Sequence, residues 1–156
     1  MTMSTTRLTR HIRAPRERIY RALLDAGAVQ RWMVPDQMTS HVHHFDARQG
    51  GTFRISLTYE MPTTAGKTSP QSDMFHGQFV KLKPDSQVVQ AVEFETDDPD
   101  MKGEMTITYT LTDAEDGGTY LVAVHEDLPS GLSPAANEQG WRRSIDKLAE
   151  LVEMDQ

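Results

Sequence analysis

The sequence predicts one α+β domain in which an antiparallel sheet is covered by a single long helix. Short runs of alternating apolar and polar residues, separated by turn residues, occupy most of positions 41–126. Residues 133–154 then carry apolar side chains at helical spacing. The chain has 156 residues, which suits one hydrophobic core, and we expect a single domain over 1–156.

The first elements are a strand and two short helices. A strand is predicted around Leu8 and Ile12, after a flexible tail at residues 1–7. From Pro15 the apolar spacing becomes helical, and Gly27 is expected to end this helix. A shorter helix follows, predicted from three apolar residues at i, i+3 and i+4: Val29, Trp32 and Met33.

The remaining strands are predicted from alternation, because successive side chains of a strand point to opposite faces. They cover residues 41–45, 52–61, 74–82, 88–95, 105–112 and 119–126. Gly50 and Gly51 form a tight turn and no phosphate-binding loop, since they open a strand and not a helix. The polar segment 62–73 is either a mobile loop or a lid over a site.

The C-terminal helix is predicted to begin with Ser133 as N-cap and a proline at the first helical position. Four apolar residues then fall in one stripe: Trp141, Ile145, Leu148 and Val152. Asn137 and Ser144 lie on the same side as that stripe, and Gly140 supports a close approach of helix and sheet. These features indicate a helix that covers something less than a fully packed core.

Composition excludes several classes of function. The net charge of −7 and the lack of a basic cluster argue against nucleic-acid binding. The sequence has no cysteine, which excludes disulfides, thiolate nucleophiles and thiolate zinc sites. No apolar run suits a signal peptide or a membrane span, so we expect a cytoplasmic protein. No phosphate loop, dinucleotide fingerprint or nucleophilic triad is present, and no cofactor is expected.

Five short motifs occur in order along the chain: APRERIYRAL at 14–23, RWM at 31–33, DARQGG at 46–51, HE at 125–126 and GW at 140–141. Over residues 9–153 the chain thereby resembles the activator of heat-shock protein 90 ATPase homologue family of the START-like (SRPBCC) superfamily. This resemblance implies a helix-grip fold. In that fold a curved antiparallel sheet of about six strands wraps around the long C-terminal helix and leaves a cavity between them.

The first candidate ligand pocket lies on the C-terminal helix. Trp141, Asn137 and Ser144 are predicted to project toward the sheet, where the two polar side chains need hydrogen-bond partners. Alternatively, Asn137 caps the helix start or meets solvent, and Ser144 only makes room.

Aromatic residues and methionine, which suits an adaptable apolar pocket, supply the other candidates. Those predicted to line the cavity are Trp32, Phe53, Tyr59, Phe94, Met105 and Tyr109. The alternative is that most of this set is ordinary core.

His125, near the end of the last strand, is a candidate general acid or base at the mouth of the cavity, or else a hydrogen-bonded structural residue. Its strand has two apolar faces, and the resemblance favours the face of Leu121, Ala123 and His125 as the inner one. The other face, with Tyr120, Val122 and Val124, makes a homodimer possible if it is exposed.

The histidines of the first hairpin suggest a metal site only weakly. His41 and His43 point the same way on a strand, but two histidines are half of a site. A third ligand such as His76 would have to come from another strand. We therefore expect exposed hairpin histidines, including His44, and no metal site.

Three functions are compatible with these observations. The first is binding of a small, largely hydrophobic molecule between the sheet and the C-terminal helix. The second is an enzyme of cyclase or hydrolase type, with its polar groups taken from His125, Glu126, Asn137 and Tyr109. The third is a protein interaction like that of the chaperone ATPase activator.

Overall fold

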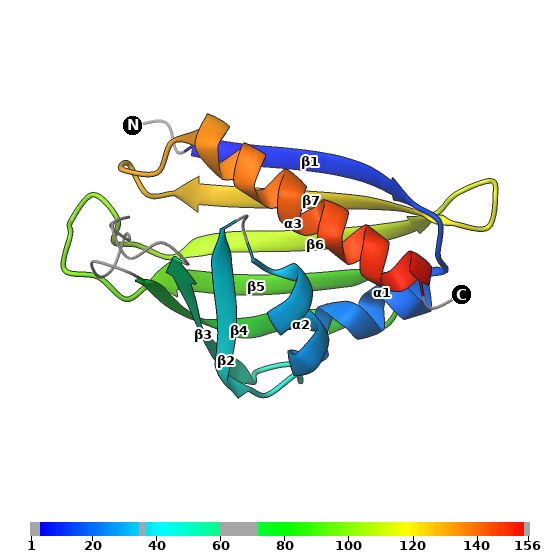
Figure 1. The fold of residues 1–156 in the computed structure, drawn as a ribbon, viewed down its shortest axis with the longest axis horizontal. Helices are drawn as coiled ribbons and strands as arrows, with labels where there is room; N and C mark the ends of the chain where they lie inside the picture. Colours follow the sequence, from blue (N-terminus) through cyan, green and yellow to red (C-terminus); the bar gives the residue numbers. More distant parts are fainter. Residues whose placement is uncertain (1–3, 35–36, 60–71, 155–156) are drawn as a thin grey trace.

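A computed structural model describes residues 4–34, 37–59 and 72–154 (Figure 1). These residues form an α+β fold, as predicted. Its elements in chain order are β1 (Ser4–Ile12), α1 (Arg16–Leu23), α2 (Ala26–Trp32), β2 (Met38–Phe45), β3 (Thr52–Tyr59), β4 (Ser72–Lys83), β5 (Gln87–Phe94), β6 (Met105–Asp113), β7 (Thr119–Leu128) and α3 (Pro134–Met154).

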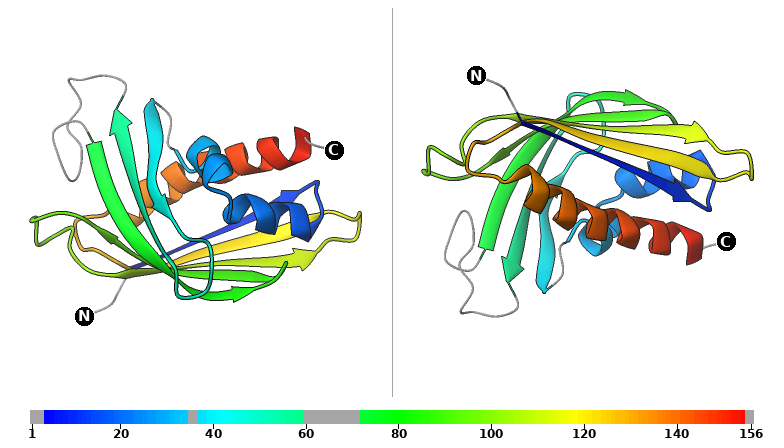
Figure 2. Two further views of the ribbon diagram at one scale, coloured as in Figure 1. Left: turned by 90° about the horizontal axis from the view of Figure 1, so that it is seen from below. Right: turned by 90° about the horizontal axis from the view of Figure 1, so that it is seen from above.

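The strands form a single antiparallel sheet in the order β1-β7-β6-β5-β4-β3-β2. Strands β2 to β7 follow one another as a meander, and β1 adds to the edge beside β7. The described sheet has seven strands, against the expectation of about six. It curves around α3, while α1 and α2 lie at one end of the same concave side (Figure 2). This is the helix-grip arrangement.

Two features of β4 favour the curvature. Gly77 leaves no room for a side chain unless its neighbours shift, because a Cβ there would lie 2.4 Å from Cζ of Phe53 and 2.6 Å from the carbonyl oxygen of Ala91. The register of β4 with β5 also shifts between Phe79 and Lys81, and a bulge of this kind bends its strand. The ring of Phe53 packs directly over Gly77, and the bulge that follows bends β4 toward α3.

The core lies between the concave face of the sheet and the helices. Strand β6 alternates as predicted, because its apolar residues are buried and the threonines between them are half-buried or exposed. On α3 the buried residues are Ser144, Ile145, Leu148, Ala149 and Val152. Oγ of Ser133 accepts a hydrogen bond from the backbone N–H of Ala136 at 3.3 Å, which confirms the predicted N-cap.

The first strand is longer than predicted. It begins at Ser4, which pairs with Leu128, and Arg7 pairs with Val124. Thr6 is buried, as Leu8 is, so the inward face of the strand includes a polar residue that the apolar pattern does not reveal. The predicted tail of residues 1–7 is therefore wrong for positions 4–7, and residues 1–3 lie outside the described chain.

The break between the two short helices also differs from the prediction. Helix α1 ends at Leu23, and Gly27 lies inside α2 and does not end α1. The carboxylate of Asp25 accepts a hydrogen bond from the N–H of Ala28 at 2.8 Å and thereby caps α2. A side-chain cap, and no glycine, defines this boundary. Among the described helices, none has the length and apolar character needed to cross a membrane.

Candidate functional site

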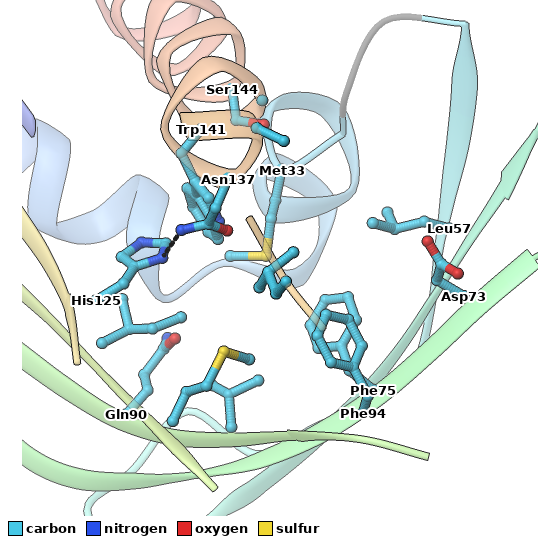
Figure 3. A pocket seen from close by; sticks show the side chains of 16 residues that line it. Met33, Leu57, Asp73, Phe75, Gln90, Phe94, His125, Asn137, Trp141 and Ser144 are labelled. Carbon is cyan, nitrogen blue, oxygen red and sulfur yellow. Dashed lines mark hydrogen bonds between the residues drawn. The ribbon is translucent and has the colours of Figure 1, made fainter. Parts of the chain in front are cut away.

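A cavity of about 180 Å³ lies between α3 and the concave face of the sheet (Figure 3). Most of its lining is apolar: Met33, Leu57, Phe75, Val92, Phe94, Met105, Ile107, Leu132, Ala136, Gly140 and Trp141. Five polar residues complete it: Asp73, Gln90, His125, Asn137 and Ser144. These residues come mainly from β3 to β7 and α3, which are the two layers of the fold.

A chain of hydrogen bonds connects His125 to the start of α3. The amide nitrogen of Asn137 lies 3.1 Å from Nδ1 of His125 and donates to Oγ1 of Thr6 at 3.2 Å. The hydroxyl of Thr6 in turn reaches the carbonyl oxygen of Pro134 at 3.5 Å. Because that hydroxyl donates to the carbonyl, its oxygen accepts from Asn137, so the Asn137 nitrogen faces the histidine. Nδ1 is then an acceptor, and the proton of the neutral imidazole lies on Nε2.

The imidazole of His125 is almost wholly enclosed. Its exposed fraction is 1%, and its ring meets that of Trp141 edge to face with centroids 4.5 Å apart. Burial disfavours the charged form and lowers the pKa of His125 to about 4. Nε2 has no hydrogen-bond partner among the described residues. His125 is therefore a neutral residue at neutral pH, with one hydrogen-bonding atom in use.

Gln90 is a second buried polar residue of the cavity. Its exposed fraction is 3%, and its side-chain amide points into the cavity (Figure 3). No hydrogen bond of this amide occurs within the described residues. The sequence analysis does not predict Gln90 as a lining residue, although the sequence carries a signal for it. It shares the alternating face of β5 with Val88, Val92 and Phe94, where a polar residue is unexpected.

Asp73 is another lining residue that the sequence patterns do not predict. It is 1% exposed and lines the cavity on the side away from His125 (Figure 3). The strand pattern was predicted to begin at residue 74, whereas β4 begins at Ser72 and pairs Asp73 with Leu57 of β3. The alternation Asp73, Phe75, Gly77 would have placed it on the inner face.

Six of the predicted pocket residues line the cavity: Phe94, Met105, His125, Asn137, Trp141 and Ser144. The alternative was that Asn137 caps the helix start or meets solvent. Its side chain is half-buried, and its amide bonds to Thr6 of β1 and His125 of β7.

Three predicted pocket residues belong to the packed core and do not line the cavity. Nε1 of Trp32 donates to the carbonyl of Ala22 at 3.1 Å, and Phe53 packs against Phe79 with ring centroids 5.1 Å apart. Tyr109 is wholly buried, and burial raises the pKa of its phenol. The side chain of Tyr59 lies outside the described residues, as do residues 62–71 of the predicted loop or lid. Residues 72–73 of that predicted segment belong to β4 instead.

Gly140 has a different role from the one predicted. A Cβ at this position would meet no atom within 4 Å, so the glycine does not permit a close contact between helix and sheet. Because Gly140 lines the cavity, the missing side chain leaves space there.

The two faces of β7 are as the resemblance indicated. Leu121, Ala123 and His125 are each 1% exposed, whereas Tyr120 on the outer face is 44% exposed. Glu126 follows His125 and is exposed, since neighbouring residues of a strand point oppositely. The homodimer stays a prediction.

The hairpin histidines make ordinary surface contacts. The rings of His41 and His43 lie 4.5 Å apart, Nε2 of His43 is 2.9 Å from Oγ of Ser56, and His76 bonds to Glu95 instead. The described part of the chain holds no group of three or more potential metal ligands.

A curved antiparallel sheet that holds a long helix over an apolar cavity defines a protein of the helix-grip class. Residues 13–153 match the family described as Activator of Hsp90 ATPase homolog 1-like protein. The chain belongs to this family, as its motifs indicated.

Solved structures agree with that assignment. A protein of Chromobacterium violaceum is 34% identical, with a TM-score of 0.85 and 96% of both chains covered. An AHSA1 protein of Silicibacter pomeroyi shares the fold at 19% identity and a TM-score of 0.78, with 98% of this chain and 100% of that one covered. An Arthrobacter aurescens protein also shares the fold, at 14% sequence identity and a TM-score of 0.80, with 96% of this chain and 86% of that one covered. No curated protein matches the sequence.

Proposed function

We propose that the protein binds a small, largely hydrophobic molecule in the cavity between the sheet and α3. The observation that carries this proposal is a cavity of about 180 Å³ whose lining is mostly apolar. An engineered apolar cavity of roughly 150 Å³ is enough to bind benzene. The resemblance to a superfamily that includes lipid and hormone carriers also supports the proposal.

Trp141 gives this binding a natural optical signal. It lines the cavity and is half-buried, so a bound molecule changes the surroundings of its indole. The other tryptophan, Trp32, is 1% exposed and does not line the cavity. A ligand that binds only the native state also raises the melting temperature by mass action.

The test is a thermal-shift and fluorescence screen of the purified protein with small aromatic and aliphatic molecules, combined with native mass spectrometry. We expect one or more compounds to raise the melting temperature and shift the emission. In the variant Gly140→Leu the leucine enters the cavity, and the response is lost. Gln139→Leu adds the same side chain at an exposed neighbouring position and keeps the response. No shift across the panel and no bound species would contradict the proposal.

The polar groups named for an enzyme are not all in one place. His125 and Asn137 line the cavity, whereas Tyr109 does not and Glu126 is exposed. An enzyme of cyclase or hydrolase type would therefore have only two of its four proposed polar groups at the cavity. We favour ligand binding over this alternative.

A further inference from the structure

We propose that the cavity selects uncharged molecules of about one aromatic ring carrying an amide or similar group, and that Gln90 recognises this group. The inference rests on the proposed function and names the chemical class of the ligand. It follows from the charges that face the cavity, from the hydrogen bonds that its polar residues already make, and from its volume.

No lysine or arginine lines the cavity within the described ranges. Two cationic side chains of the surrounding elements have partners elsewhere: Nζ of Lys147 on α3 donates to the carbonyl of Val34 at 2.6 Å, and Arg10 on β1 pairs with Asp146. The acidic side chain in the lining is Asp73. A buried anion without a countercharge is strongly disfavoured.

The polar end of the cavity is uncharged. Asn137 donates to Nδ1 of His125, which fixes a neutral imidazole, and the lowered pKa of His125 agrees with this state. Asp73 lies across the cavity from His125 and Gln90 (Figure 3). A cation placed beside Gln90 would therefore lose its water and find neutral partners there, which disfavours a cationic group at this end of the cavity as well.

Gln90 presents both halves of an amide. Its side chain is 3% exposed and makes no hydrogen bond with the described residues, so its C=O and NH₂ groups are open to a ligand. A ligand amide satisfies an acceptor and a donor together, whereas an apolar ligand leaves both unsatisfied at a cost. The volume of about 180 Å³ restricts the ligand to roughly one ring.

Benzamide, benzoate and benzamidinium test this inference, because they are similar in size and outline and differ in charge near neutral pH. Toluene serves as the apolar reference. Titration calorimetry of the intact protein is expected to show benzamide binding at least about tenfold more tightly than benzoate or benzamidinium. Equal or tighter binding of either ion would overturn the inference. Binding of toluene without a preference for benzamide would overturn it too, while leaving the proposed function intact. No binding of any of the four compounds would contradict both.

A pair of variants separates recognition by Gln90 from a general effect on the sheet. Gln90→Met keeps the length of the side chain and removes the amide, and it is expected to lower the affinity for benzamide about tenfold relative to the affinity for toluene. Gln87→Met is the control, because Gln87 lies on the same strand, bonds to Oγ1 of Thr110 at 3.4 Å and does not line the cavity. If folded Gln90→Met binds benzamide as tightly as the unaltered protein does, Gln90 does not recognise the amide. The selection against charged ligands is tested separately, by the ligand series on the unaltered protein.

Discussion

The side-chain nitrogen of Asn137 on α3 lies 3.1 Å from Nδ1 of His125 on β7. This contact joins the helix to the sheet at the polar end of the cavity, and it also decides which nitrogen of the histidine carries the proton. The same nitrogen donates to Thr6 on β1. One asparagine therefore connects three elements that are far apart in the sequence.

Replacing Asn137 by alanine is expected to lower the free energy of unfolding by about 1–3 kcal/mol, because buried partners on Thr6 and His125 lose their hydrogen bond. Urea denaturation monitored by circular dichroism measures the change. Gln139→Ala is the matched control, since Gln139 is exposed on the same helix. Similar stability in the two variants would mean that the contact contributes nothing to the fold.

His125 is expected to make stability dependent on pH in the acidic range. Its pKa is about 4 in the folded protein and about 6.5 in the unfolded chain, so the unfolded state binds more protons between these values. Stability therefore falls as the pH falls from about 6.5 to about 4, by roughly 3 kcal/mol in total from this group. Urea unfolding at a series of pH values, compared with His125→Gln, isolates the contribution. If the free energy of unfolding of His125→Gln changes with pH as steeply as that of the unaltered protein, His125 is not the source of the dependence.

Replacement by alanine is expected to change the stability of the protein in opposite directions at two glycines. Gly140→Ala adds a Cβ that meets no atom within 4 Å and removes a poor helix former, so stability rises by up to about 1 kcal/mol. Gly77→Ala places a Cβ 2.4 Å from the ring of Phe53 and lowers stability by about 1–3 kcal/mol. Urea midpoints of the two variants test this, and a shift of the same sign in both would contradict the packing described.

Tyr109→Phe is expected to leave stability unchanged or to raise it by about 1 kcal/mol or more. The phenol oxygen is buried and has no hydrogen-bond partner in the described chain, so removal of the oxygen relieves a desolvation cost and breaks no contact. The melting temperature measures the effect, with Tyr120→Phe at the exposed ring as control. A clear loss of stability confined to Tyr109→Phe would show that the hydroxyl has a partner.

The sequence predicts the sheet and α3 well because their signals are local. Alternation on β6 and the apolar stripe with the Ser133 cap on α3 depend on near neighbours, and both are found. The N-terminal part of β1 is different, because it pairs with β7 across most of the chain. Its polar residue Thr6 is buried through contacts that no local pattern contains.

The site was predictable where a polar residue interrupts an apolar helical stripe, as Asn137 and Ser144 do. Gln90 and Asp73 interrupt the inner face of strands in the same way, but single polar residues in strands are easily taken for the outer face. Trp32, Phe53 and Tyr109 were assigned to the pocket by residue type. Only the packing separates a lining residue from a core residue, because both are buried and apolar.

A crystal structure of the protein grown with toluene tests ligand binding in the cavity most directly. The expected result is toluene density bounded by Trp141, Met105, Phe94 and Gln90, with the backbone of α3 in the same place. If these side chains instead collapse together, so that the interior is filled by protein atoms and no toluene density lies between α3 and the sheet, the proposed binding function is wrong.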